Sequence, residues 1–213
     1  MDSANNYKTR IKQEPDVAER YTRRKERKHS AEMRLIATAI SSLPRPMKYL
    51  DIPCGAGRAT ILLGRKGNTC VSADIGDGVL EVARKEIEKA GIESEILKLD
   101  IENIDLPDNS IDAPLAFRIF HHFPNTEIRA KVVAELCRVS NRYVLISYLT
   151  PWSYTNIKRR LRATLGGKIS RQHATHLSEL EAYFSAHGYG LVNDYAITSF
   201  NSLHLAVFEC AGP

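Results

Sequence analysis

The 213-residue sequence has no apolar run approaching the roughly 18 residues needed to cross a bilayer. Its first six residues, Met1 to Asn6, are polar and lack the apolar core of a secretory signal. Internal repeats and low-complexity tracts are also missing. These absences predict a cytoplasmic protein with no transmembrane segment, built as one globular domain with small additions.

Paired metal-binding cysteines are a further absence. The four cysteines, Cys54, Cys70, Cys137 and Cys210, are scattered along the chain and show no metal-type spacing. We therefore expect buried, reduced thiols and no metal site.

Hydrophobic residues make up 43% of the sequence, which is ample for a core at this length. The net charge of +5 is unevenly distributed. Residues 1–34 carry a balance of +4 and residues 151–171 a balance of +6, which leaves the remainder mildly acidic. Two basic segments on an acidic core indicate an anionic partner.

Between these segments, β-type and helical patterns alternate, which predicts an α/β fold with a parallel sheet and right-handed crossovers. We expect strands at 47–53, 69–75, 95–101, 112–120 and 142–149, followed by a hairpin of 191–199 and 203–210. The expected helices are 16–42, with a break near Ser30, and then 58–66, 79–90, 126–139 and 178–187.

One stretch carries most of the chemistry. The strand that ends at Asp51 is followed by Pro53, Cys54, Gly55, Ala56 and Gly57, and then by a helix. A strand, a tight glycine turn and a helix form the nucleotide-binding geometry of open α/β sheets. A carboxylate at this strand end would repel a pyrophosphate and attract a cation. The pattern therefore favours S-adenosylmethionine, with its ammonium and sulfonium groups, over NAD.

Three carboxylates, Asp51, Asp74 and Asp100, are placed at the carboxyl ends of three consecutive predicted strands, where ligands bind in such sheets. Asp51 can orient the glycine loop and attract an ammonium, and Asp74 can accept both ribose hydroxyls. Asp100 can accept from the adenine amino group while the Ile101 N–H donates to the ring, with Ile75 and Ile101 on either side of the base. Gly55 and Gly57 let the backbone approach the ligand.

These residues resemble the motifs of the class I S-adenosylmethionine-dependent methyltransferases of the small, single-domain, quinone-biosynthesis type. Asp51 to Arg58 is similar to the family's D-x-x-C-G-x-G-R motif, and residues 73–75 and 99–112 are similar to its ribose and adenine motifs. Segments 118–124 and 135–139 resemble the family's stretches after the fourth strand and before the fifth.

The resemblance implies a Rossmann-like, doubly wound, seven-stranded mixed sheet whose last strand is antiparallel. It also implies that Cys54 and Arg58 belong to the cofactor site. Residues 1–42 would form a basic N-terminal arm and helical lid, and residues 43–213 the cofactor-binding domain, with a basic lid insertion at 151–175.

Two adjacent histidines, His121 and His122, follow the fourth predicted strand and are expected near the transferred methyl group. A neutral imidazole there can take a proton from the acceptor, so we predict His121 or His122 as the catalytic base if the reaction needs one. The alternative is that these histidines position the substrate, pack on the cofactor or bond to the backbone. We expect Arg118 to contribute its backbone carbonyl to the ammonium of the cofactor.

The sequence gives the least information about the methyl acceptor. The basic segments favour a small-molecule or lipid-like acceptor, anionic in character, lined by Tyr21, Arg24, Tyr148, Trp152 and Arg159. Peripheral contact with a membrane surface is a variant of this interpretation. The alternatives are a nucleic-acid methyltransferase, a cofactor-binding but non-catalytic partner protein, and an NAD-dependent dehydrogenase; a solvated helix face with no partner also explains the charge.

Overall fold

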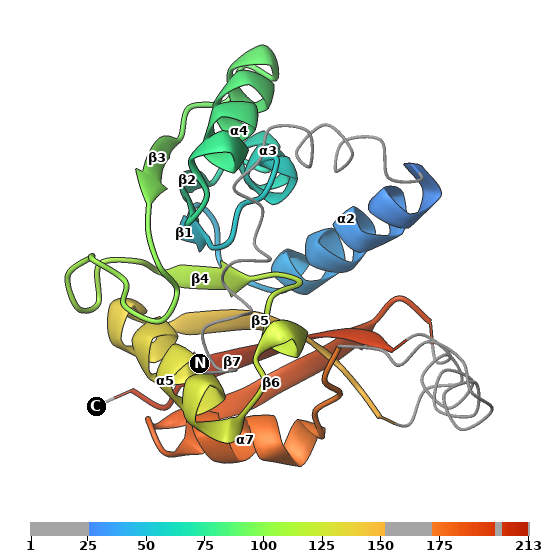
Figure 1. Ribbon diagram of the computed structural model, residues 1–213, viewed down its shortest axis with the longest axis vertical. Helices are drawn as coiled ribbons and strands as arrows, with labels where there is room; N and C mark the ends of the chain where they lie inside the picture. The colour runs from blue at the N-terminus through green and yellow to red at the C-terminus, as the bar shows by residue number, and fades with distance from the viewer. Residues whose placement is uncertain (1–25, 152–171, 199–201, 213) are drawn as a thin grey trace, which may run out of the picture.

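The computed structural model describes residues 26–151, 172–198 and 202–212. Tyr21, Arg24, Trp152 and Arg159, four of the expected acceptor-lining residues, lie outside these ranges. The described chain forms a seven-stranded sheet with helices on both faces (Figure 1). Its strands are β1 (Lys48–Asp51), β2 (Thr69–Asp74), β3 (Glu95–Lys98), β4 (Ala113–Ala116), β5 (Tyr143–Leu149), β6 (Tyr189–Ala196) and β7 (Leu203–Cys210).

The strands lie in the order β3-β2-β1-β4-β5-β7-β6. The first five are parallel, and β7 pairs antiparallel with both β5 and β6. This confirms the predicted doubly wound mixed sheet with an antiparallel last strand. The strand order reverses between β1 and β4, and ligands bind at such a switch point in open α/β sheets.

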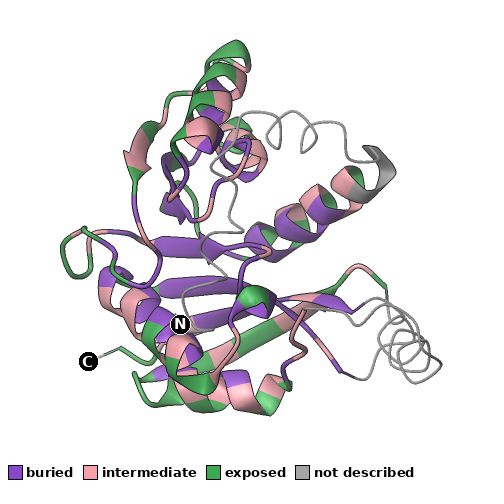
Figure 2. Cartoon of the chain, viewed as in Figure 1, coloured by how far each residue is buried: buried purple, intermediate pink, exposed green. Residues whose placement is uncertain are grey.

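Three helices, α2 (Glu26–Ser41), α3 (Arg58–Arg65) and α4 (Asp77–Lys89), cover one face of the sheet. Two others, α5 (Thr126–Val139) and α7 (Leu177–Ser185), cover the opposite face (Figure 1). The helix α2 buries Ile36, Ala39 and Ile40 completely or nearly so against this core. Burial is greatest in the central strands β4 and β5, which are covered on both sides and therefore read as continuous apolar runs (Figure 2).

The structure differs from the sequence expectation within one helix and at several element boundaries. The helix α2 runs through Ser30 without a break, and β3 ends at Lys98, two residues before Asp100. The strand β4 ends at Ala116, and Phe120–His122 form a short 3-10 helix, η2. Ile119 and Phe120 are buried by packing without strand pairing, and their apolar character made the predicted strand too long.

The four cysteines are free, as expected, and three of them are buried; Cys210 is half-buried. Burial raises the pKa of Cys70 and of Cys137 to about 12, which keeps both thiols protonated. Within the described residues we find no group of side chains suited to hold a metal ion. No helix in these residues is both long and apolar enough to cross a membrane.

Candidate cofactor-binding site

The site begins at Asp51, the last residue of β1, which is 1% exposed. Its Oδ2 accepts hydrogen bonds from the backbone N–H of Thr60 at 3.0 Å and from the Thr60 hydroxyl at 2.8 Å. Thr60 lies in the first turn of α3, whose early N–H groups have no partner within the helix. Asp51 thus fixes the start of α3 against the end of β1, and the glycine loop closes between them.

The burial of Asp51 also sets its protonation. Desolvation raises the pKa of this carboxyl to about 7, and the negative charge of Asp74 acts in the same direction. The two hydrogen bonds from Thr60 and the charge of Arg58 oppose the shift. Asp51 is therefore poised between its neutral and ionised forms near neutral pH, and a cation placed beside it would favour ionisation.

Asp74, the last residue of β2, is 3% exposed and contacts the glycine loop directly. Its Oδ2 accepts from the N–H of Gly55 and its Oδ1 from the N–H of Gly76, both at 3.2 Å. Each carboxylate oxygen has a second lone pair, so the side chain retains capacity to accept from a ligand hydroxyl.

Both loop glycines have positive φ, 55° at Gly55 and 73° at Gly57. At Gly57 the structure adds a steric reason for glycine. A Cβ at this position would lie 2.6 Å from Cγ1 of Ile87 in α4. Glycine is thus needed at position 57 because the loop packs closely against α4, whether or not a ligand also approaches it.

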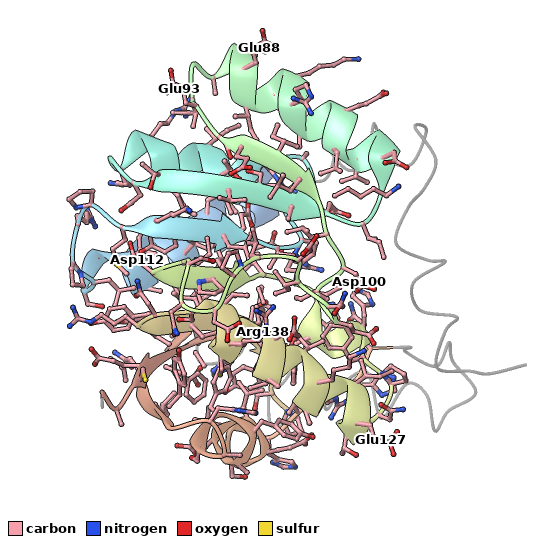
Figure 3. All side chains as sticks on the ribbon, turned by 90° about the vertical axis from the view of Figure 1, so that its left-hand side faces the viewer. Glu88, Glu93, Asp100, Asp112, Glu127 and Arg138 are labelled. Atoms are coloured by element: carbon pink, nitrogen blue, oxygen red, sulfur yellow. The ribbon has the colours of Figure 1, made fainter. Side chains whose placement is uncertain are left out.

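The third carboxylate, Asp100, lies beyond β3 in a turn where its Oδ1 accepts from the N–H of Glu102 at 3.0 Å. Figure 3 places Asp100 at the opposite sheet edge from Asp112, the residue before β4. Asp100 therefore lies at the carboxyl ends of the parallel strands, as the sequence predicts. The neighbouring Ile101 is buried within the core, and Ile75 is half-buried beside Asp74.

A clamp from α5 holds the loop that follows Asp100, and sequence reasoning assigned it no role. The Arg138 guanidinium donates to the carbonyl of Ile104 at 2.6 Å and to that of Leu106 at 2.9 Å. Glu135 binds Arg138 and accepts from the Ile104 N–H at 2.8 Å. Hydrogen bonds from Arg138 lower the pKa of Glu135. The available signal was the Glu-x-x-Arg spacing, which puts both side chains on one helical face.

Arg118 follows β4 in a left-handed conformation, with φ of 63°. Its N–H donates to the Ser147 hydroxyl of β5 at 2.6 Å, which fixes the orientation of this peptide. Its guanidinium forms an ion pair with Glu32 of α2, a side chain with no exposed surface. The side chain of Arg118 is therefore directed to α2, which leaves the backbone carbonyl as the group expected to face a ligand.

The two histidines differ in environment. His121 is 1% exposed and His122 is exposed, with their ring centroids 4.3 Å apart. Two contacts hold this segment: the His173 N–H donates to the His121 carbonyl at 2.9 Å, and Arg129 donates to the Phe123 carbonyl. Arg129 is in turn paired with Glu179 of α7 at 2.8 Å. The histidine pair is thus held on the α5–α7 side of the sheet.

The remaining predicted residues are placed as follows. Cys54 is buried and its pKa is raised by desolvation, and Arg58 begins α3. Tyr148, on β5, is 2% exposed and donates to Asp194 of β6 at 2.9 Å.

Comparison with known proteins identifies the core. A family model described as a methyltransferase domain matches residues 50–143, the segment that contains the three carboxylates and the glycine loop. This segment is therefore similar to a methyltransferase domain. Over 82 residues the chain is also 34% identical to a ubiquinone biosynthesis O-methyltransferase of Dinoroseobacter shibae, covering 37% of this chain. The match spans only about a third of that relative, 33% of its length.

Solved structures resemble the fold over most of the chain. A magnesium protoporphyrin IX methyltransferase of Synechocystis, crystallised with S-adenosylhomocysteine (SAH), gives a TM-score of 0.72 at 14% identity and covers 85% of this chain and 84% of its own. A S-adenosylmethionine-dependent methyltransferase of Aquifex aeolicus gives 0.67 at 17% identity and covers 94% and 100%. At these identities the likeness concerns the fold alone.

Proposed function

We propose that the protein is a S-adenosylmethionine-dependent methyltransferase. The observation that carries this function is the pair of buried carboxylates, Asp51 and Asp74, on either side of the Gly55–Gly57 turn. A dinucleotide pyrophosphate would meet the charge of Asp51 at this turn, whereas an ammonium would be attracted to it. The site residues therefore fit S-adenosylmethionine.

Each part of this cofactor has a complementary group. Asp51 and the Arg118 carbonyl receive the ammonium, and Asp74 accepts the ribose hydroxyls. Asp100 and the N–H of Ile101 receive the adenine edge, with Ile75 and Ile101 packing on the ring. Cys54, Gly55, Gly57 and Arg58 form the backbone cradle between them. Asp51 and Asp74 occupy the ends of adjacent strands, so these contacts converge on one sheet edge.

When bound, S-adenosylmethionine supplies a methyl group on an already activated sulfonium. The protein then has to hold the acceptor in line and exclude water, since positioning accounts for most of the acceleration in such reactions. We assign the positioning of the acceptor to His121 and His122. Arg129 and His173 fix the segment that carries them, which gives the rigidity that this role requires.

The acceptor is a small molecule or lipid-like compound with anionic character. This proposal rests on the basic segments, on the O-methyltransferase name of the curated relative and on the porphyrin named for one structural neighbour. We propose that residues 1–42 and 151–175 flank the acceptor, with Tyr148 at the edge of its site.

Calorimetry tests the cofactor assignment. We expect SAH to bind with a dissociation constant in the micromolar range or tighter and NAD to show no binding. Tight binding of NAD without binding of SAH would overturn the proposal. An Asp74→Asn variant serves as a control, because it should weaken SAH binding while retaining the shape of the side chain.

A second experiment addresses catalysis and acceptor class. Labelled S-adenosylmethionine is incubated with a set of small phenols and carboxylates, or with an RNA oligonucleotide, over a range of salt concentrations. We expect SAH to form with the small molecules. Methylation of RNA, with binding that weakens steeply as salt rises, would instead support a nucleic-acid methyltransferase. Cofactor binding without any product would support a non-catalytic partner protein.

A further inference from the structure

Three polar side chains from the last three strands of the sheet meet at one carboxylate. Asp194 of β6 accepts from the Tyr148 hydroxyl at 2.9 Å and contacts Nδ1 of His204 at 2.7 Å, both through its Oδ2. The rings of Tyr148 and His204 have centroids 5.5 Å apart. Tyr148 and His204 are also register partners in the β5–β7 ladder, so the sheet itself fixes their proximity.

This arrangement selects one tautomer of His204. An ionised Asp194 carboxylate can only accept hydrogen bonds, so a neutral His204 that bonds to it must carry its proton on Nδ1. The lone pair then lies on Nε2, which has no hydrogen-bond partner among the residues that the structure describes. A fifth of the His204 side chain is exposed, so a ligand can contact this side chain.

The surroundings of His204 are negatively charged. The Oδ2 atom of Asp194, a side chain that is 18% exposed, lies 2.7 Å from Nδ1 of the ring. Tyr148 is neutral, since burial and the charge of Asp194 raise its pKa far above the usual value. Glu181 of α7 adds a further negative charge near Tyr148. Among the described residues of β5, β6 and β7, no Lys or Arg side chain pairs with Tyr148, Asp194 or His204.

The cluster occupies the same sheet edge as the cofactor site. Tyr148 is near the carboxyl end of β5, and His204 is near the start of the antiparallel β7, which begins at that edge. Ser147, which precedes Tyr148, accepts the hydrogen bond from the N–H of Arg118. The cluster therefore lies on the three strands beyond β4, on the side away from the cofactor carboxylates.

We propose that His204 accepts the proton of an acceptor hydroxyl, of the phenol or enol class, during methyl transfer. This inference rests on the proposed function. The acceptor O–H bond breaks and its proton moves to Nε2, the oxygen electron pair forms the new O–C bond, and the pair of the broken C–S bond stays on sulfur. The imidazolium is stabilised by Asp194 and returns its proton to water. Tyr148 holds the carboxylate in place and is a positioning residue.

The first experiment uses phenols of graded acidity at one fixed pH. We compare the wild type with His204→Gln and with His187→Gln, a control that alters an exposed histidine at the opposite end of β6. Phenols that are un-ionised in solution should be methylated about 10²–10⁴-fold more slowly by His204→Gln, the range for loss of a general base. Phenols already ionised at that pH should react at nearly the wild-type rate, and His187→Gln should behave as the wild type throughout.

The second experiment needs no turnover. The ¹⁵N shifts of the His204 ring, assigned by comparison with His204→Gln, report its tautomer directly. We expect the Nδ1–H tautomer in the wild type, with a shift towards the Nε2–H form in Asp194→Ala, which removes the acceptor. A wild-type ring that is mainly Nε2–H would overturn the proposal.

The outcomes separate this inference from the function on which it rests. Failure of the wild type to bind SAH would overturn the methyltransferase assignment itself. If SAH binds and phenols are methylated, an equal loss across the acidity series, or no loss in His204→Gln, would overturn the role of His204. If SAH binds but no phenol is methylated, the hydroxyl acceptor is wrong and the inference falls with it.

Discussion

Two buried carboxylates at the ends of adjacent strands do different work because their partners differ. Asp51 holds the beginning of α3 through Thr60, whereas Asp74 holds the glycine loop through Gly55. The sequence predicted both positions because a strand end followed by Gly-x-Gly is a local pattern. It could not predict the Thr60 contact, since this depends on how α3 packs against β1.

Asp74 provides the first prediction. In Asp74→Ala the ribose hydroxyls lose their acceptor and the N–H groups of Gly55 and Gly76 lose theirs, so SAH affinity should fall by about 1–3 kcal/mol. Calorimetry measures the change. Asp77→Ala is the matched control, because the exposed Asp77 forms its ion pair with the exposed Lys98 and should leave affinity unchanged. Equal affinity of Asp74→Ala and wild type would refute the ribose role.

The raised pKa of Asp51 makes cofactor binding dependent on pH. An ammonium beside the carboxylate favours its ionised form, so binding must expel a proton at pH values below about 7, where Asp51 is largely protonated. Affinity for SAH should therefore rise between pH 6 and 8. Calorimetry in buffers of different ionisation enthalpy should detect proton release near pH 6.5 in the wild type and none in Asp51→Asn. Proton uptake would contradict this assignment.

At the scale of elements, alternation of apolar and helical patterns was sufficient to predict all seven strands and the order in which helices connect them. The ends of strands were harder to predict where residues are buried by packing and not by strand pairing. Ile119 and Phe120 are buried although β4 ends at Ala116, because they belong to the same core cluster as the buried apolar side chains of α5. Contacts between distant elements, such as Arg138 with the loop after β3, leave no local trace beyond helical spacing.

The ion pair between α2 and the segment after β4 is a second contact of this type. Glu32→Ala leaves the Arg118 guanidinium, with 15% of its side chain exposed, without its carboxylate. Breaking a buried pair costs about 3–5 kcal/mol, so the free energy of unfolding in urea should fall by an amount near the lower end of this range. Glu88→Ala, on the exposed face of α4, should change it by less than about 0.5 kcal/mol.

Loss of the Glu32–Arg118 ion pair should also weaken cofactor binding. Because Glu32 fixes the direction of the Arg118 side chain and Ser147 fixes its N–H, loss of the pair should loosen the Arg118 carbonyl. SAH affinity of Glu32→Ala should then fall as well, with Glu32→Asp intermediate. A variant that loses stability but binds SAH as tightly as the wild type would limit Glu32 to a structural role.

For the whole molecule, cofactor binding should be visible as a gain in stability. A ligand that binds only the folded state at 100 times its dissociation constant stabilises by about 2.7 kcal/mol. For a domain of this size that corresponds to a rise in Tm of roughly 5–10 °C. A thermal melt with SAH should show this rise, and the same concentration of NAD should not. A rise with NAD alone would favour the dehydrogenase alternative.

The distribution of charge over the chain leads to the last prediction. Lys158, Arg159, Arg160 and Arg162 belong to the sequence segment between β5 and α7, which we propose flanks the acceptor. A variant in which all four are replaced by Gln removes these charges together. If this segment captures an anionic acceptor, KM for a phenol that carries a carboxylate should rise roughly three- to tenfold, in keeping with a few exposed charge pairs. KM for the uncharged phenol and the affinity for SAH should not change.

The control variant replaces four exposed cations by Gln: Lys66, which follows α3, and Arg84, Lys85 and Lys89 of α4. The control should leave both KM values and the affinity for SAH unchanged. An equal rise of KM for both phenols would show that the segment acts through structure, because a screened electrostatic attraction cannot act on an uncharged acceptor.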